Sequence, residues 1–292
     1  GDGDHTTLCC IPEDATGSSH LLIKEDGILA GVEVAKNVFA AFDPTLKVEV
    51  RIPDGSPVKV GDIAMVVTGK TRSLLQTERL MLNIMQRMSG IATMTRQYVE
   101  RLKGTHTRIL DTRKTTPGLR MLEKQAVKIG GGTNHRIGLF DMILLKDNHI
   151  DFAGGIENAI DRCHRYLKDK KLDLKIEIEV RDFGELQRVL DKGGVDRVML
   201  DNFSVPDTRK AVKLIAGRVE TESSGGITFD TIRDYAEQGI DFISVGALTQ
   251  GFGYEFQGLL AFVLSNIKTQ SFELVVQYIS RGECRFRFTG QL

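Results

Sequence analysis

The sequence contains no tryptophan and only four cysteines among its 292 residues. Cys9, Cys10, Cys163 and Cys284 form no C-x-x-C pair and are too few for a disulfide scaffold, so we expect reduced thiols. The opening residues, GDGDHTT, lack the basic and apolar segments of a secretion signal, and no apolar run is long enough to span a bilayer. These absences predict a soluble, cytoplasmic protein with no membrane partner.

An excess of either charge sign is also absent, because 39 Lys and Arg residues balance 39 Asp and Glu residues. General binding to nucleic acid depends on a surplus of cations, so no nucleic-acid partner is expected. The hydrophobic content of 41% and the charged content of 27% are those of an ordinary globular protein. A neutral total still allows charge to be sorted locally around a small anionic substrate.

The first part of the chain reads as strands followed by helices. Between residues 20 and 70, short apolar runs such as KVEVRIP and DIAMVVTG alternate with turns that contain glycine and proline. Apolar residues then recur at helical spacing from Leu74 to Met88, and a second helical pattern runs from Ile91 to Leu102. We assign residues 1–107 to an N-terminal domain.

The part from residue 108 to 250 repeats strand, loop and helix. Helices are predicted over 120–128, 155–168, 182–192, 206–216 and 229–238, with Ser204 and Thr228 as N-caps of the last two. Such repeats predict a parallel sheet covered by helices, either open or closed into a barrel. The predicted strands are Arg108 to Asp111, Met142 to Lys146, Leu174 to Val180, Asp196 to Asp201, Arg218 to Glu222 and Asp241 to Gly246.

Nearly every one of these strands ends on a polar residue or a glycine, and the barrel rule places active sites at such ends. The residues concerned are Asp111, Lys146, Glu179, Asp201, Glu222 and Gly246. The stretch from Arg108 to Asp147 is also locally basic, with eight Lys or Arg against four Asp or Glu. Its cations suit carboxylates and phosphates, although a solvated basic face is the other interpretation. The candidate anion ligands are Arg113, Lys114, His135, Arg136 and Lys146.

Glu179 and Asp201 end consecutive strands and suit a Mg²⁺ ion held partly through water, while salt bridges to the nearby cations are the alternative. Glu177 points the same way as Glu179, one layer deeper, and is a weaker candidate. The segment ESSGGIT places Ser224, Gly225 and Gly226 between a strand and a helix, where a phosphate can bind. Gly246 ends the next strand in the same way, although plain turns would also use these glycines.

Several long segments, taken in order, resemble the quinolinate phosphoribosyltransferase family. They are QTERLMLNIMQRMSGIAT, DTRKTTPGLR, GGGTNHRIGLFDMILLKDNH, IEIEV, RVMLDNF, ETESSGGIT and ISVGALT. The resemblance implies an N-terminal α/β sandwich domain followed by a seven-stranded α/β barrel, working as a homodimer or larger homo-oligomer. The sequence after Thr249 does not resemble the family's end, so residues 251–292 are expected to form an atypical segment that returns to the N-terminal domain.

The resemblance also implies roles for the residues already selected. Arg113, Lys114, His135, Arg136 and Lys146 would bind the quinolinate carboxylates, and Arg79 would be lent to the neighbouring subunit's site. Lys146, Glu179 and Asp201 would bind phosphoribosyl pyrophosphate (PRPP) with Mg²⁺, and Ser224, Gly225, Gly226 and Gly246 would hold its phosphate. Lys114, Lys146, Glu179 and Asp201 would be the catalytic set.

The implied reaction joins the pyridine nitrogen to the ribose of PRPP, expels pyrophosphate and then removes CO₂, to give nicotinate mononucleotide for NAD biosynthesis. It needs no redox cofactor and no covalent nucleophile, and the sequence shows no Ser-His-Asp arrangement, G-x-G-x-x-G or Walker segment. Two alternatives stay open. One is a molybdenum-transport-associated relative with an unknown substrate, and the other is an inactive subunit with a binding or assembly role.

Overall fold

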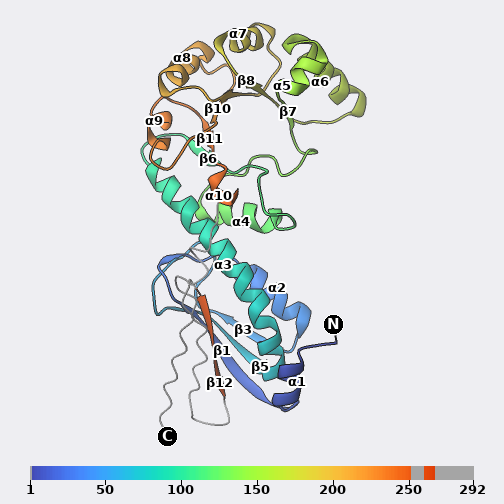
Figure 1. Cartoon of the computed structure of the whole chain (residues 1–292), viewed down its shortest axis with the longest axis vertical. Helices are drawn as coiled ribbons and strands as arrows, with labels where there is room; N and C mark the ends of the chain where they lie inside the picture. The colour runs from blue at the N-terminus through green and yellow to red at the C-terminus, as the bar shows by residue number, and fades with distance from the viewer. Residues whose placement is uncertain (1, 251–259, 267–292) are drawn as a thin grey trace. The chain divides into compact units, whose positions relative to one another are not determined.

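The computed structural model describes residues 2–250 and 260–266, which fall into two compact units (Figure 1). The first unit runs to Met94 and also takes in Lys128–Gly130 and the last described strand. The second unit runs from Thr95 to Val127 and from Gly131 to the end of the last described helix. Most of the predicted closing segment 251–292 lies outside the described residues.

Within the described residues, the first unit is built on a four-stranded antiparallel sheet in the order β12-β1-β5-β3. These strands are β12 (Leu260–Asn266), β1 (Thr16–Ile23), β5 (Ile63–Lys70) and β3 (Lys47–Val50), with a short pair formed by β2 (Gly27–Ile28) and β4 (Pro57–Val58). Every second residue of β1 is buried, as expected for a strand with one face on a core. That core contains Leu21, Phe39, Met65 and Met81, so helices cover one face of the sheet.

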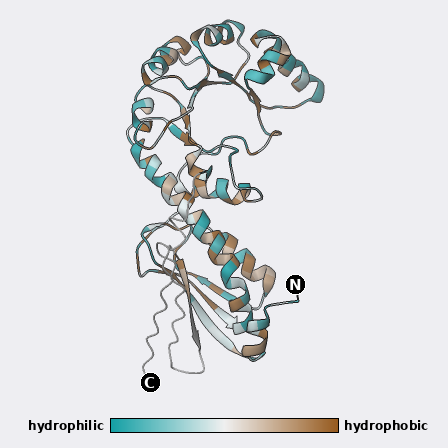
Figure 2. Ribbon diagram, viewed as in Figure 1, coloured by the Kyte–Doolittle hydropathy of each residue, from teal (hydrophilic) through white to brown (hydrophobic). Residues whose placement is uncertain are grey.

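The helices of this unit are α1 (His5–Cys10), α2 (Val32–Phe42) and the first part of α3 (Thr71–Arg101). The prediction of two helices, from Leu74 to Met88 and from Ile91 to Leu102, is wrong, because α3 is continuous. Between the two patterns, the buried Ser89 hydroxyl accepts a hydrogen bond from the Ala30 amide at 2.9 Å. The small residues at this point therefore allow close packing of the chain without ending the helix. Figure 2 shows hydrophilic and hydrophobic segments along α3.

The second unit contains six parallel strands in the order β6-β11-β10-β9-β8-β7, and all six predicted strands are confirmed. They are β6 (Arg108–Leu110), β7 (Ile143–Leu145), β8 (Ile176–Val180), β9 (Arg197–Asp201), β10 (Glu220–Ser224) and β11 (Phe242–Ser244). In Figure 1 they curve into a ring with helices outside it. The resemblance implies seven strands; among the described residues, Thr133 continues the ring beyond β6 only as an isolated parallel bridge to Leu110.

Each predicted helix of this part is present, although the bounds differ by a few residues. The helices are α4 (Arg120–Gly130), α5 (Asp147–Ala153), α6 (Ile156–Lys170), α7 (Phe183–Lys192), α8 (Val205–Ile215), α9 (Ile232–Ala236) and α10 (Ala247–Gln250). Ser204 caps α8 as predicted, by accepting from the Asp207 amide. Thr228 does not cap α9; the helix begins later, with Thr231 at the N-cap, because residues 229–231 form a turn.

Strand register decides which side chains face the inside of the ring. Glu177 lies opposite Arg197, which lies opposite Glu220, and Glu179 lies opposite Met199. Because alternate residues of a strand share a face, Glu177 and Glu179 point inward, while Ile178 is fully buried on the other face of the same strand. The inner face therefore carries charge, and the outer face packs against the helices.

Among the described residues, no helix is both long and apolar enough to cross a membrane.

Candidate active site

Lys146 and Glu179 form an ion pair at the carboxyl ends of β7 and β8. Lys146 directly follows β7, and its Nζ lies 2.8 Å from Glu179 Oε2. The Lys146 side chain is 46% exposed and the Glu179 side chain 12% exposed, so the cation reaches the opening while the carboxylate lies below it. The salt bridge considered as an alternative for Glu179 is therefore present, and an anionic ligand could compete for the same ammonium group.

Asp201 ends β9 and is held by the residue that follows it. The Asn202 side-chain amide donates to Asp201 Oδ2 at 2.7 Å, and the Asn202 backbone amide donates to the Ser224 carbonyl at 2.8 Å. Asn202 has a φ of 57°, a left-handed conformation that asparagine tolerates better than most residues. This turn ties the carboxylate end of β9 to the glycine loop after β10.

The glycine loop after β10 adopts a backbone conformation that favours glycine, as expected from the sequence. Gly225 and Gly226 both have positive φ, at 94° and 62°. A Cβ atom on Gly225 would lie 2.2 Å from Asn202 Oδ1, so only glycine fits against this turn. Ser224 lies opposite Asp201 in the register of β10 and β9, so the loop and that carboxylate open at the same edge.

The basic residues after β6 approach the loop after β11. Thr249 Oγ1 donates to the Lys114 carbonyl at 2.8 Å, and a Cβ atom on Gly246 would lie 3.9 Å from Lys114 Cδ. Arg113 is partly buried, and its Nε has no hydrogen-bond partner among the described residues. Burial first, and then the Arg113 guanidinium, lower the pKa of Arg136. Two guanidinium groups are thus close together and incompletely paired, which favours an anion between them.

The loop that carries His135 and Arg136 is anchored from below by a buried ion pair that sequence reasoning missed. Asp111 and Lys124 are 0% and 2% exposed, and they pair directly. Asp111 accepts from the His135 amide at 2.9 Å, and Lys124 Nζ donates to the His135 carbonyl at 3.1 Å. The strand-end position of Asp111 was visible in the sequence, but its partner on α4 was not.

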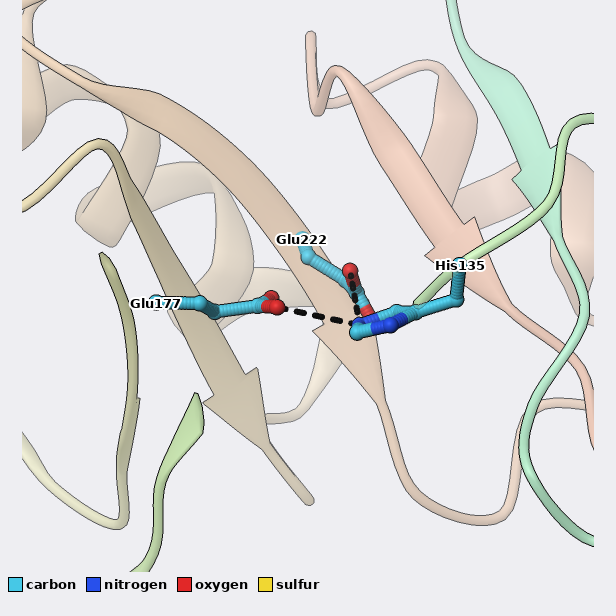
Figure 3. Close-up of side chains that lie close together, drawn as sticks. All are labelled: His135, Glu177 and Glu222. Carbon is cyan, nitrogen blue, oxygen red and sulfur yellow. Dashed lines mark ion pairs between the residues drawn. The ribbon is translucent and has the colours of Figure 1, made fainter. Parts of the chain in front are cut away.

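A second buried cluster lies inside the ring, where His135 faces two carboxyl groups (Figure 3). His135 Nε2 lies 3.0 Å from Glu177 Oε2 and 3.5 Å from Glu222 Oε2. Arg197 Nη1 lies 3.2 Å from Glu222 Oε2, and its guanidinium also lies 4.0 Å from the centre of the Phe242 ring. Glu177 is one layer below Glu179, as its strand position predicts, and it is fully buried.

The pKa values in this cluster shift as burial requires. Burial, and then the Glu177 carboxylate, raise the pKa of Glu222 to about 8. Burial lowers the pKa of His135 despite the neighbouring Glu222, so the imidazole is neutral at neutral pH. Glu222 was noted from the sequence only as a polar strand end, and Arg197 was not selected at all. The signal available for both was their alternate positions on inward-facing strands.

The second unit thus brings most of the predicted site residues to one end of its ring. Arg79 is the exception, since it lies on the exposed side of α3 in the first unit. The set at the strand ends is Arg113, Lys114, His135, Arg136, Lys146, Glu179, Asp201, Ser224, Gly225, Gly226 and Gly246.

This arrangement defines an α/β-barrel protein that collects charged side chains at the carboxyl ends of its strands, where such barrels hold their active sites. The family model for the C-terminal domain of quinolinate phosphoribosyl transferase matches residues 91–254, and that for its N-terminal domain matches residues 4–89. The chain therefore belongs to the quinolinate phosphoribosyltransferase family.

Individual relatives agree with this assignment. The chain is 45% identical over 261 residues to quinolinate phosphoribosyltransferase [decarboxylating] 1b of Nicotiana tabacum, covering 85% of this chain and 74% of the relative. It is 39% identical over 249 residues to the probable nicotinate-nucleotide pyrophosphorylase [carboxylating] of Bacillus subtilis, covering 85% and 84%. The crystal structure of NadC from Streptococcus pyogenes superimposes with a TM-score of 0.81 at 38% identity, covering 90% of each chain.

Proposed function

We propose that this chain is a quinolinate phosphoribosyltransferase, which converts quinolinate and PRPP to nicotinate mononucleotide, pyrophosphate and CO₂. One observation carries the proposal. At one edge of the ring lie two loops rich in Lys and Arg, the carboxylates of Glu179 and Asp201, and the glycine loop after β10. A dicarboxylate and a phosphorylated sugar need these groups in combination. Curated relatives named for this activity support it.

Quinolinate would bind among the cations after β6 and β7. Burial first, and then the nearby Arg113 guanidinium, lower the pKa of the partly buried Arg136, and a planar dicarboxylate between the two cations would relieve their repulsion. Lys114 and the exposed Lys146 ammonium complete the basic set, and Lys146 can exchange Glu179 for a ligand carboxylate. His135 lies deeper, beside Arg136 in the same loop.

PRPP would bind across β8, β9 and β10. Glu179 and Asp201 would accept hydrogen bonds from the ribose hydroxyls, and the amides of the loop at Ser224, Gly225 and Gly226 would bind the 5′-phosphate. Gly246 comes after β11, at the same edge of the sheet. A Cβ atom at this position would lie 3.1 Å from Gln250 Oε1, so there is little space for a side chain.

Mg²⁺ is the cation that the carboxylate oxygens at this edge would suit, because both acids are partly accessible and Asp201 keeps one oxygen outside its bond to Asn202. Glu179 and Asp201 would hold it together with the diphosphate, mostly through water, and it would neutralise charge on the leaving pyrophosphate. The protein's own contribution is to orient the two substrates and to place negative charge beside the ribose, where positive charge develops as pyrophosphate leaves. Decarboxylation then draws on the pyridinium ring, so no redox cofactor is required.

The finer assignments of assembly and compartment are also proposals. A homodimer or larger homo-oligomer would let Arg79 enter the site of a neighbouring subunit. A cytoplasmic location stays a prediction, because some plant relatives are named as chloroplastic or mitochondrial proteins, and cell fractionation would test it.

The direct test is PRPP-dependent release of CO₂ from carboxyl-labelled quinolinate by the full chain, with nicotinate as a comparison acceptor that should not react. Turnover of quinolinate would exclude both an inactive subunit and a molybdenum-transport-associated relative with another substrate. Binding of quinolinate without turnover would favour the inactive subunit. A folded protein that neither binds nor converts quinolinate would contradict the proposal.

Lys146→Ala should lower kcat/KM at least about a hundredfold, because it removes a positioned cation from the reacting groups. Its folding should be nearly unchanged, since the Lys146 side chain is 46% exposed. Lys168→Ala on the exposed side of α6 is the matched control and should leave activity unchanged. Near-normal turnover by the Lys146 variant would remove that residue from the site.

A further inference from the structure

Below the proposed substrate site, Glu177, Glu222 and His135 form a cluster whose chemistry the reaction above does not use. Glu177 and Glu222 are 0% exposed and His135 is 8% exposed. One ligand atom from each lies within 4.8 Å of the others, and Figure 3 shows both carboxyl groups directed toward the imidazole. The cluster comes from β8, β10 and the loop before β7, so the ring itself brings it together.

Several buried polar atoms of this cluster lack a hydrogen-bond partner. Both carboxyl oxygens of Glu177, Oε1 of Glu222 and Nε2 of His135 have no hydrogen-bond partner among the described residues. Buried oxygens without a donor are costly, so a donor is expected. A proton carried by one of the two carboxyl groups would supply it, because a protonated carboxyl donates and a carboxylate accepts.

The charged residues around the cluster also favour a proton on one of the two glutamates. Arg197 lies opposite Glu177 in the strand register and pairs with both Glu220 and Glu222, so one guanidinium serves three acidic groups. Lys124, below His135, is already paired with Asp111. Arg136 is the remaining cation that acts on both His135 and Glu177. Two ionised glutamates would therefore be undercompensated in this buried space.

We propose, on the basis of the function above, that Glu222 is a positioning residue that remains a neutral carboxylic acid and donates a hydrogen bond to Glu177. The Glu177 carboxylate then attracts the His135 ring electrostatically, with Glu177 Oε2 3.0 Å from His135 Nε2. The other ring nitrogen, Nδ1, accepts from the Arg136 backbone amide at 2.7 Å, which assigns the proton of the neutral ring to Nε2. Burial and the Glu177 charge, which raise the pKa of Glu222 to about 8, agree with this assignment.

Through His135, the protonation of Glu222 would control the position of the Arg136 backbone. The His135 backbone is fixed by Asp111 and Lys124, and its ring is fixed by Glu177 and by the Arg136 amide. Loss of the Glu222 proton to solvent would leave two carboxylates side by side, and their repulsion would displace the Glu177 carboxylate that lies against the His135 ring. The Arg136 backbone would shift, and with it one of the cations proposed to bind quinolinate.

The test compares Glu222→Gln, Glu222→Ala and a control on the same strand, Glu220→Gln, by the pH dependence of kcat/KM for quinolinate. The unsubstituted enzyme should lose activity as the pH rises past about 8. Glu222→Gln keeps a neutral donor, so it should retain activity near neutral pH and lose the alkaline decline. Glu222→Ala should lower kcat/KM about tenfold or more at every pH, because Glu177 loses its donor. Glu220→Gln leaves the Glu222 proton in place and should keep the decline.

Infrared difference spectroscopy supplies a measurement that needs no turnover. The unsubstituted protein at neutral pH should show the carbonyl band of a buried carboxylic acid, and Glu222→Gln should lack it. An alkaline decline that persists in Glu222→Gln, or an absent acid band, would overturn the inference. A metal ion bound in equal amount to the chain and lost in Glu222→Gln would also overturn it. Absence of CO₂ release from the unsubstituted protein would instead count against the proposed function.

Discussion

At the scale of single residues, the turn at Asn202 and the glycine loop at Gly225 depend on each other. Asn202 adopts a positive φ, bonds the Asp201 carboxylate and donates its amide to Ser224. Gly225 leaves the space that the Asn202 side chain fills, since a Cβ atom there would come within 3.0 Å of the Asn202 backbone nitrogen as well. The close contact between Gly225 and Asn202 therefore couples the Asp201 carboxylate to the loop proposed to bind the phosphate of PRPP.

Gly225→Ala tests that coupling against Gly226→Ala. Both positions have positive φ, so both variants should lose about 1 kcal/mol of stability from backbone strain. Only a Cβ on Gly225 displaces Asn202, because nothing lies within 4 Å of one on Gly226. The KM for PRPP should therefore rise much more in Gly225→Ala, measured with quinolinate saturating and alongside thermal denaturation. Equal KM values in the two variants would show that the approach has no functional role.

Much of this residue-scale chemistry could be predicted, and the limit has a physical reason. Lys146, Glu179, Asp201 and Gly225 stand out because they lie at the ends of strand patterns or directly after them. The pairing of Arg197 with Glu222 depends on the register between neighbouring strands, and no local pattern reports that register. The pairing of Lys124 with Asp111 likewise joins a helix to a strand end across a loop.

At the scale of elements, caps decide where the helices of the second unit begin. Ser204 Oγ accepts from the Asp207 amide at 3.2 Å and donates to its carboxylate at 2.7 Å, ahead of a proline in the first turn of α8. The same kind of signal failed at Thr228, where Thr231 Oγ1 instead accepts from the Thr228 amide and the chain makes a further turn before α9. A cap residue predicts a helix start only when the following residues are free to continue into the helix.

Ser204→Ala should reduce the free energy of unfolding by about 1 kcal/mol, because the orphan amide at the start of α8 loses its acceptor. Ser204→Asp keeps an acceptor at the same position and should recover most of that loss. The midpoint of urea unfolding, measured at constant slope, reports both changes. A Ser204→Ala midpoint equal to that of the unsubstituted protein would mean that solvent satisfies the amide equally well.

At the scale of the whole molecule, a balanced charge total conceals a strongly charged site. The 39 cations and 39 anions cancel over the sequence, yet one ring collects the pairs of Lys146 with Glu179, Lys124 with Asp111 and Arg197 with Glu222. The charge balance argued against a nucleic-acid partner, but only the order of the strands brings these ion pairs together. The two-unit organisation leaves Arg79 in a different unit from the rest, which is why its role requires an experiment on the assembled protein.

Mixing Arg79→Ala with Lys146→Ala tests whether sites are shared between subunits. In a mixed dimer, one site would combine an intact Lys146 with an Arg79 from the other chain, so an equal mixture that exchanges subunits should recover about a quarter of full activity. Each variant alone should be nearly inactive. The control mixes Arg79→Ala with a chain that carries both substitutions, because no complete site can form in that pair. Equal activity in the two mixtures would contradict a contribution of Arg79 across the interface, and size-exclusion chromatography with light scattering would establish whether the chains associate at all.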